Sequence, residues 1–361
     1  MAKSLGMRQV GFVDVAGGGQ VVVRDGIAYV GHMRAPHGTT IIDVRDPARP
    51  VVLAELSMPP GTHSHKVRVA GNILVINQEL NFNDPNPPPQ DFRGGICIYD
   101  VSNPREPQLL NRWETGGQGV HRFDLDGRYA YLSSTTDGYL AHIVIILDLE
   151  NPGRPVEVGR WWMPGQWIAG GETPTWDRTA HRCHHPLRRG NRLYTSYWQA
   201  GFVILDIDDI SKPKRISGLD WSPPYHCPTH TTLPLPFDIR GRRYMVVADE
   251  DVYRPGGWRA GILVDGGHHQ RAPPRPRRKL PGRRTGGWSA ALVDRLPPAL
   301  RNRHRDGNPD GLVRLRAARN RRFQPAFTTR SRLLCSGCTA GSGSRSEQRR
   351  YSRRTWVALS Y

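Results

Sequence analysis

Residues 95–113 read GICIYDVSNPREPQLLNRW and contain the repeated pattern from which the fold class can be predicted. A short apolar strand ends in Asp, a turn with Asn and Pro follows, and a second short strand begins after the second proline. The same pattern recurs at residues 39–56, 144–161 and 202–221. The aligned aspartates are Asp43, Asp100, Asp148 and Asp206, at steps of 57, 48 and 58 residues. Self-similarity at a period of about 50 residues indicates a repeat architecture.

A second recurrent unit lies between these segments, and it is a pair of strands hinged at glycine. Examples are VVVRDGIAYVG at residues 21–31 and RFDLDGRYAYLSST at residues 122–135. The runs are short, β-branched and aromatic, which is typical of strands. Each unit therefore supplies four antiparallel strands, the pattern of a β-propeller blade. Four complete blades can be read, and we expect six or seven in an intact ring; the alternative is a β-sandwich with irregular strands.

Three of the segments, IIDVRDPARP, IYDVSNPREP and ILDLENPGRP, resemble the LVIVD repeat. The resemblance covers about residues 8–255, with four motifs in register. The chain is more distantly similar to the propellers of selenium-binding proteins and methanethiol oxidases. The resemblance implies an all-β propeller fold, but LVIVD-repeat proteins do not share one established activity.

The hinge glycines align the blades and reveal a column of histidines. These glycines are Gly26, Gly71, Gly127 and Gly190. The residues six positions earlier are Gln20, His65, His121 and His184. A fifth unit begins with His230, eleven residues before Gly241. Because the first strand of a blade lines the central channel, we expect the four histidines to converge at one mouth of it.

Convergent imidazoles are suited to binding Fe, Cu or Zn. The column therefore predicts a metal centre at His65, His121, His184 and His230. Selenium-binding propellers also carry metal-binding histidines on their axes, so that resemblance implies the same. The alternative is that channel histidines only bond to water or backbone. Further candidate ligands are His63, His185, Glu79 and Glu250, although the two glutamates are expected to be solvated loop acids unless they orient a ligand histidine.

The net charge of +19 is confined to one end of the 361-residue chain. Residues 1–253 carry 26 Lys and Arg against 27 Asp and Glu, whereas residues 254–361 carry 25 against 5. The end is also rich in Arg, Pro and Gly, and a shifted reading frame can restore blade motifs there. We therefore expect an incomplete propeller at 1–258 and a basic, disordered, frameshifted tail at 259–361 that leaves the fifth blade without its outer half.

Several classes of protein are excluded by pattern. The 5 cysteines form no disulfide framework, no signal-peptide pattern opens the chain, and no apolar run reaches membrane-helix length. These features predict a cytoplasmic protein. The leading hypothesis is a metal-dependent redox or hydrolytic enzyme acting on an unknown small molecule. The alternatives are a non-catalytic scaffold binding a protein or ligand at the channel mouth, and nucleic-acid binding through the tail, which lacks RGG repeats and interleaved aromatics.

Overall fold

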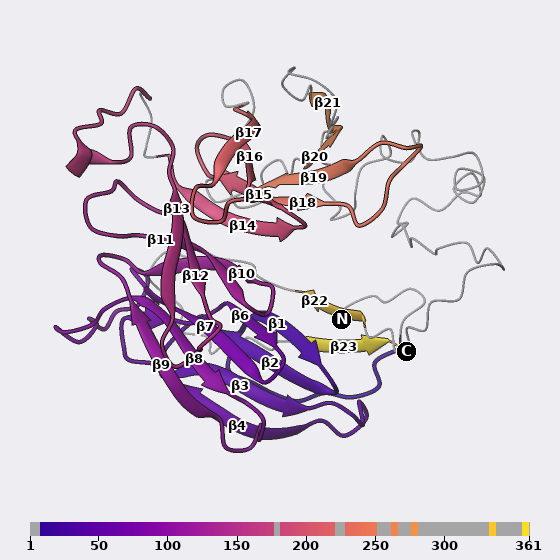
Figure 1. The fold of residues 1–361 in the computed structure, drawn as a ribbon. Helices are drawn as coiled ribbons and strands as arrows, with labels where there is room; N and C mark the ends of the chain where they lie inside the picture. Colours follow the sequence, from indigo (N-terminus) through magenta and orange to yellow (C-terminus); the bar gives the residue numbers. More distant parts are fainter. Residues whose placement is uncertain are drawn as a thin grey trace, which may run out of the picture.

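The computed structural model describes residues 8–176, 181–220, 228–250, 261–265, 276–280, 332–336 and 356–360. Within them the fold is all-β, a β-propeller built from consecutive antiparallel sheets (Figure 1). The first sheet contains β1 (Gly18–Arg24), β2 (Ile27–His32), β3 (His37–Asp43) and β4 (Val51–Ser57). The second contains β5 (Thr62–His63), β6 (Val67–Ala70), β7 (Ile73–Leu80), β8 (Gly95–Asp100) and β9 (Gln108–Glu114).

The next two sheets repeat the order of the first. The third contains β10 (Val120–Leu125), β11 (Tyr129–Ser134), β12 (Ile143–Asp148) and β13 (Val156–Trp161). The fourth contains β14 (Cys183–Arg189), β15 (Arg192–Tyr197), β16 (Phe202–Asp206) and β17 (Lys214–Leu219). A short 3-10 helix, Ile168–Gly170, lies in the loop between them. The first strands β6, β10, β14 and β18 contact one another in chain order, and β1 contacts β6, so the sheets share one axis as blades do.

A fifth sheet continues the series with β18 (Thr229–Pro234), β19 (Tyr244–Asp249), β20 (Gly261–Asp265) and β21 (Pro276–Leu280). Among the described residues, β20 pairs with β19 and β21 with β20, and Ile262, Leu263 and Val264 of β20 form an apolar run suited to a strand. The expectation that the tail leaves this blade without its outer half stays a prediction, because most of 251–280 lies outside the described residues. A separate pair is formed by β22 (Arg332–Ser336) and β23 (Trp356–Ser360). The packing of the rest of 259–361 lies outside the described residues.

The recurrent aspartates end the third strand of each blade and fix the turn that follows. Each carboxylate accepts a hydrogen bond from the backbone N–H two residues later, at 2.7–3.0 Å. These bonds satisfy backbone donors that the sheet cannot reach, which is why Asp recurs there. The four aspartates are Asp43, Asp100, Asp148 and Asp206.

Most of the hydrophobic core lies between blades, and one further cluster lies within the first blade and the residues beside it. Ile96 and Ile98 of β8 pack with Phe123 of β10 and Ile145 of β12, all of them almost completely buried. Equivalent clusters join the first blade to the second, the third to the fourth, and the fourth to the fifth. Each such buried side chain contributes about 1.5–3 kcal/mol. The blades therefore stabilise one another, and the first strands are held rigidly around the axis.

No helix among the described residues is long and apolar enough to cross a membrane.

Gly119 precedes β10 and lies where the second and third blades approach each other closely. It forms an isolated bridge with Glu79 of β7, and a Cβ added to Gly119 would lie 2.3 Å from the Gln78 carbonyl oxygen. Its φ of +103° resembles the +108° of Gly127, where an added Cβ meets nothing within 4 Å. The two positions thus share backbone strain and differ in available space.

We therefore expect Gly119→Ala to destabilise the protein more than Gly127→Ala. The left-handed backbone alone costs about 1–2 kcal/mol in both variants. The clash with backbone at Gly119 adds about 1–3 kcal/mol. Urea unfolding of both variants measures the difference, and equal losses of unfolding free energy would contradict the close approach of these blades.

Candidate metal centre

Three of the predicted histidines occupy β-bulges at the start of a first strand. His121 is the extra residue between Val120 and Arg122, which pair with consecutive residues of β11. His184 and His230 occupy the same irregular position in β14 and β18. A bulge bends its strand and redirects a side chain that regular alternation would point elsewhere. The repeat of this irregularity explains why the three imidazoles converge.

His65 reaches the same region through another break in regular strand structure. It lies in the break between β5 and β6, and its carbonyl accepts a hydrogen bond from the Gln20 N–H at 2.8 Å. The backbones of Gly19 and Gly31 approach it so closely that a Cβ on either would lie within 2.9 Å of its atoms. The first blade therefore holds His65 in position without contributing a histidine of the column.

The four histidines form an arc in blade order. The ring centroids are 5.4 Å apart for His65 and His121, 4.8 Å for His121 and His184, and 4.6 Å for His184 and His230. His184 is 1% exposed and His65 is 4% exposed. The structure thus brings together all four residues that the hinge alignment selected.

Glu79 is a buried carboxylate that contacts His121 of this arc. Its Oε2 accepts hydrogen bonds from His63 Nε2 at 2.8 Å and from His121 Nδ1 at 2.7 Å, and its Oε1 lies 3.6 Å from His142 Nε2. The residue is 1% exposed within β7, so the expectation of a solvated loop acid is wrong. Burial alone would raise the pKa of Glu79, but His121 and the three imidazole contacts lower it well below its usual value.

Hydrogen bonds fix the tautomers of two central histidines. His184 Nδ1 lies 2.6 Å from the His230 carbonyl oxygen, which can only accept, so Nδ1 carries the proton. His121 Nδ1 donates to the Glu79 carboxylate in the same way. Burial lowers the pKa of His121 to about 3 and that of His184 well below 6.5, so both rings are neutral at pH 7. Their Nε2 atoms, which lie 3.0 Å apart, therefore present two lone pairs to each other.

His230 Nε2 is a third acceptor, and its lone pair is already occupied by a hydrogen bond. Arg122 donates from its terminal guanidinium nitrogen to His230 Nε2 at 2.6 Å, and His230 Nδ1 lies 2.6 Å from the Thr231 hydroxyl. Burial, with the nearby charges of Arg122 and Lys66, lowers the pKa of His230 to about 3. Glu250 lies 3.9 Å from His230 Nε2, and its side chain is 37% exposed. This glutamate is therefore placed at the open end of the arc.

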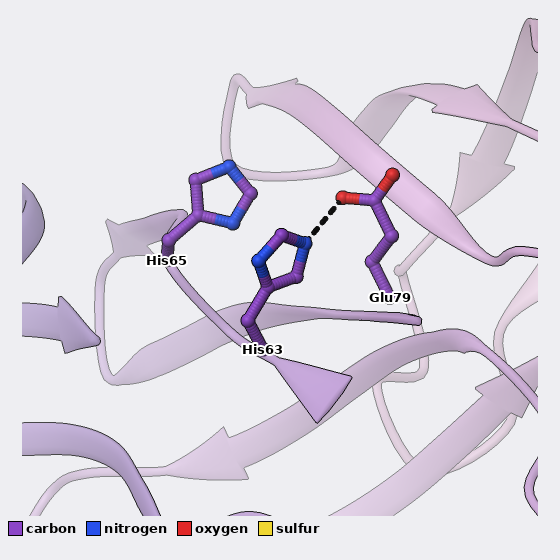
Figure 2. Close-up of side chains that lie close together, drawn as sticks. All are labelled: His63, His65 and Glu79. Atoms are coloured by element: carbon purple, nitrogen blue, oxygen red, sulfur yellow. Dashed lines mark hydrogen bonds and ion pairs between the residues drawn. The ribbon is translucent and has the colours of Figure 1, made fainter. Parts of the chain in front are cut away.

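Two groups of side chains have the composition of a metal site. In the first, the ligand atoms of His63, His65 and Glu79 lie within 4.8 Å of one another (Figure 2). In the second, the atoms of His184, His230 and Glu250 do the same. His121 lies between the groups and contacts both through its two nitrogens. His185, a further candidate, is buried but belongs to neither group.

His142 is a cluster residue that the hinge alignment did not select. It precedes β12 and is 1% exposed beside Glu79. The signal that could have found it is its position six residues before Asp148, which repeats that of His37 before Asp43. His37 is partly buried and its ring contacts only the His32 ring, with centroids 5.9 Å apart, among the contacts described for it.

Similarity to a known protein family is found in the repeat segments. The LVIVD repeat family matches residues 90–115 and 189–217, which include β8, β9, β15 and β16. The chain contains LVIVD repeats. No curated protein matches the chain. The distant likeness to selenium-binding and methanethiol oxidase propellers stays a prediction.

Solved structures similar to the chain have low sequence identity to it. The computationally designed Ika4 protein is 9% identical, with 56% of this chain and 99% of that chain covered and a TM-score of 0.36. Saccharomyces cerevisiae Sqt1 is 11% identical, with 71% and 61% covered and a TM-score of 0.45. A thermostable family-43 glycoside hydrolase is 14% identical, with 75% and 99% covered and a TM-score of 0.36.

Proposed function

We propose that the histidine arc binds a transition metal ion and that the metal serves redox or hydrolytic chemistry on a small molecule. The core ligands are the Nε2 atoms of His121, His184 and His230. His65 and Glu250 lie at the two ends of the arc as further ligands. Glu79 acts as the positioning residue that orients His63 and His121.

The observation that carries this proposal is the pair of facing lone pairs on His121 and His184. Two neutral acceptors 3.0 Å apart cannot form a hydrogen bond with each other, and their lone pairs repel. A cation between them relieves that repulsion. Metal–imidazole bonds of about 2.0–2.1 Å place two ligand nitrogens about 2.8–3.4 Å apart on one ion, for bond angles between about 90° and the tetrahedral value. The separation observed between the two Nε2 atoms fits that range.

The chemistry of the ligand atoms limits which metal ions suit the site. Imidazole with one carboxylate suits Zn, Cu or Fe, and none of the core ligands is a thiolate. Three protein ligands leave coordination positions for water or substrate, which is typical of catalytic sites. When bound, such a metal supplies a Lewis acid or an oxygen-activating centre. The buried imidazoles are already neutral, so they need to release no proton on binding.

Elemental analysis of the purified chain, after dialysis against Zn²⁺, Cu²⁺ or Fe²⁺ and then buffer, tests the proposal. We expect about one equivalent of metal per chain in at least one of the three preparations. A chain that retains no metal in any preparation would contradict the proposal and favour the scaffold alternative, in which the histidines only bond to one another and to backbone.

A second expectation concerns Glu79. The variant Glu79→Gln keeps the side-chain shape but replaces the carboxylate that holds the protons on His63 Nε2 and His121 Nδ1. Loss of such a partner typically lowers metal affinity about 10–100-fold. The matched control is Glu55→Gln in β4, where the glutamate is exposed. Competition titration against a chelator measures both, and equal affinity of the two variants would exclude the positioning role.

A further inference from the structure

A second set of side chains follows the histidine column by one residue. Lys66, Arg122 and His185 come directly after His65, His121 and His184, on three successive blades. The terminal guanidinium nitrogen of Arg122 reaches His230 Nε2 at 2.6 Å, so its charge lies at the arc itself. The electrostatic neighbours of His185 are Arg122, Arg68 and Lys66, together with His230. The three blades therefore direct these groups toward one region beside the proposed metal ligands.

Lys66 and Arg122 are partly buried cations in this region. Arg68 pairs with Asp124 at 3.3 Å, but neither Lys66 nor Arg122 makes an ion pair within the described part of the chain. Within the described residues, the carboxylates that act electrostatically on both Lys66 and Arg122 are those of Glu250 and Glu79, and neither makes a direct ion pair with them. Partly buried cations without a direct ion-pair partner are costly, and a bound anion offsets that cost.

Unused hydrogen-bonding atoms point to the same conclusion. His185 is 8% exposed, and its Nδ1 has no hydrogen-bond partner in the ranges that the structure describes. The Arg122 Nε is also buried and unpartnered there. Buried polar atoms are normally satisfied, so such orphans indicate a missing water or ligand. An oxyanion can accept from a guanidinium, an ammonium and an imidazole N–H together.

We propose that Lys66, Arg122 and His185 bind an oxyanion group, a carboxylate or a phosphate, of the small-molecule substrate. This inference rests on the proposed function, because the anion is described as part of a substrate only if a metal is bound beside it. The binding itself requires only these three side chains. Metal at His230 Nε2 would also displace the Arg122 donor from that atom and leave it available to the anion.

The test uses the full chain freed of metal by chelation and inorganic phosphate as the probe, followed by calorimetric titration at fixed ionic strength. We expect saturable binding that Arg122→Gln and Lys66→Met each weaken at least tenfold. The control is Arg49→Gln, which removes a surface charge paired with Asp46 and leaves phosphate affinity within twofold. Lys66→Met replaces a buried cation by an apolar chain of similar length, so its melting temperature should not fall below that of the wild type.

Two results would contradict the proposed oxyanion site, called here the subsite. One is the absence of saturable phosphate binding by the wild-type chain. The other is equal affinity in all three variants, which would place the binding elsewhere, for example on the Arg-rich residues after 253. Because the assay contains no metal, its failure with metal binding intact contradicts only the subsite. Saturable phosphate binding in a chain that takes up no metal contradicts only the proposed metal centre.

Discussion

Replacing His121 and His184 together by alanine is expected to reduce transition-metal affinity by at least about 1000-fold. The two residues supply the facing Nε2 atoms 3.0 Å apart, and both are fixed as acceptors by bonds from their Nδ1 atoms. Removing them leaves His65 and His230 at opposite ends of the arc, without the intervening rings that complete the donor set. Calorimetric titration with Zn²⁺ and Cu²⁺, with a competing chelator, measures the loss.

The matched control is His37→Ala in the first blade. His37 occupies the position equivalent to His142, yet its ring contacts only His32 among its described contacts. We expect this variant to bind metal with the wild-type affinity. If the double variant also kept wild-type affinity, the metal would be bound elsewhere and the arc would be a structural cluster.

Acid is expected to destabilise the metal-free protein strongly. Burial lowers the pKa of His121 and of His230 to about 3, whereas an unfolded histidine titrates near 6.5. Between these values the unfolded chain binds more protons than the folded chain, so stability is fully present above pH 6.5 and falls as the pH drops toward 3. Each of the two histidines should cost about 2–3 kcal/mol of unfolding free energy between pH 6 and pH 4.

Urea unfolding of the chelator-treated chain at several pH values tests this dependence. The variant His121→Gln cannot take up the proton and should show a shallower loss between pH 6 and pH 4, whatever its stability at pH 7. A wild-type unfolding free energy that stays constant or rises on acidification would show that the imidazoles are not buried as neutral groups.

The repeat and the histidine arc could be predicted because both depend on regular spacing. The aspartate motif recurs once in each of the first four blades, and each repeat also contains one hinge glycine. Counting back six residues from these glycines found His65, His121 and His184. The bulge at His121, His184 and His230 is equally regular, although spacing alone does not reveal it. Propeller geometry then turned equal positions in the chain into neighbouring positions in space.

Glu79 could not be placed by the same reasoning. Its segment resembles the end of an exposed strand, and its burial arises from the bridge to Gly119 of the next blade. Arg122 was missed because regular alternation places the residue after His121 on the other face of the strand, whereas the bulge lets its guanidinium reach His230. Both depend on contacts between blades, which no single repeat contains.

Ile262–Val264 pair with β19 within a stretch whose composition predicts disorder, and that disorder stays a prediction. The frameshift hypothesis stays a prediction, because most of 259–361 lies outside the described residues. The nucleotide sequence around the codons for Gly256 to Ile262 would test it directly.

X-ray absorption spectroscopy of the metal-loaded chain shows directly whether the histidine arc binds the metal. We expect a first shell of nitrogen and oxygen at about 2.0–2.1 Å, with the outer scattering of at least three imidazoles. The His121→Ala/His184→Ala chain should lack that imidazole signature. A shell dominated by sulfur, or one of oxygen without imidazole scattering, would contradict a metal centre on the histidine arc.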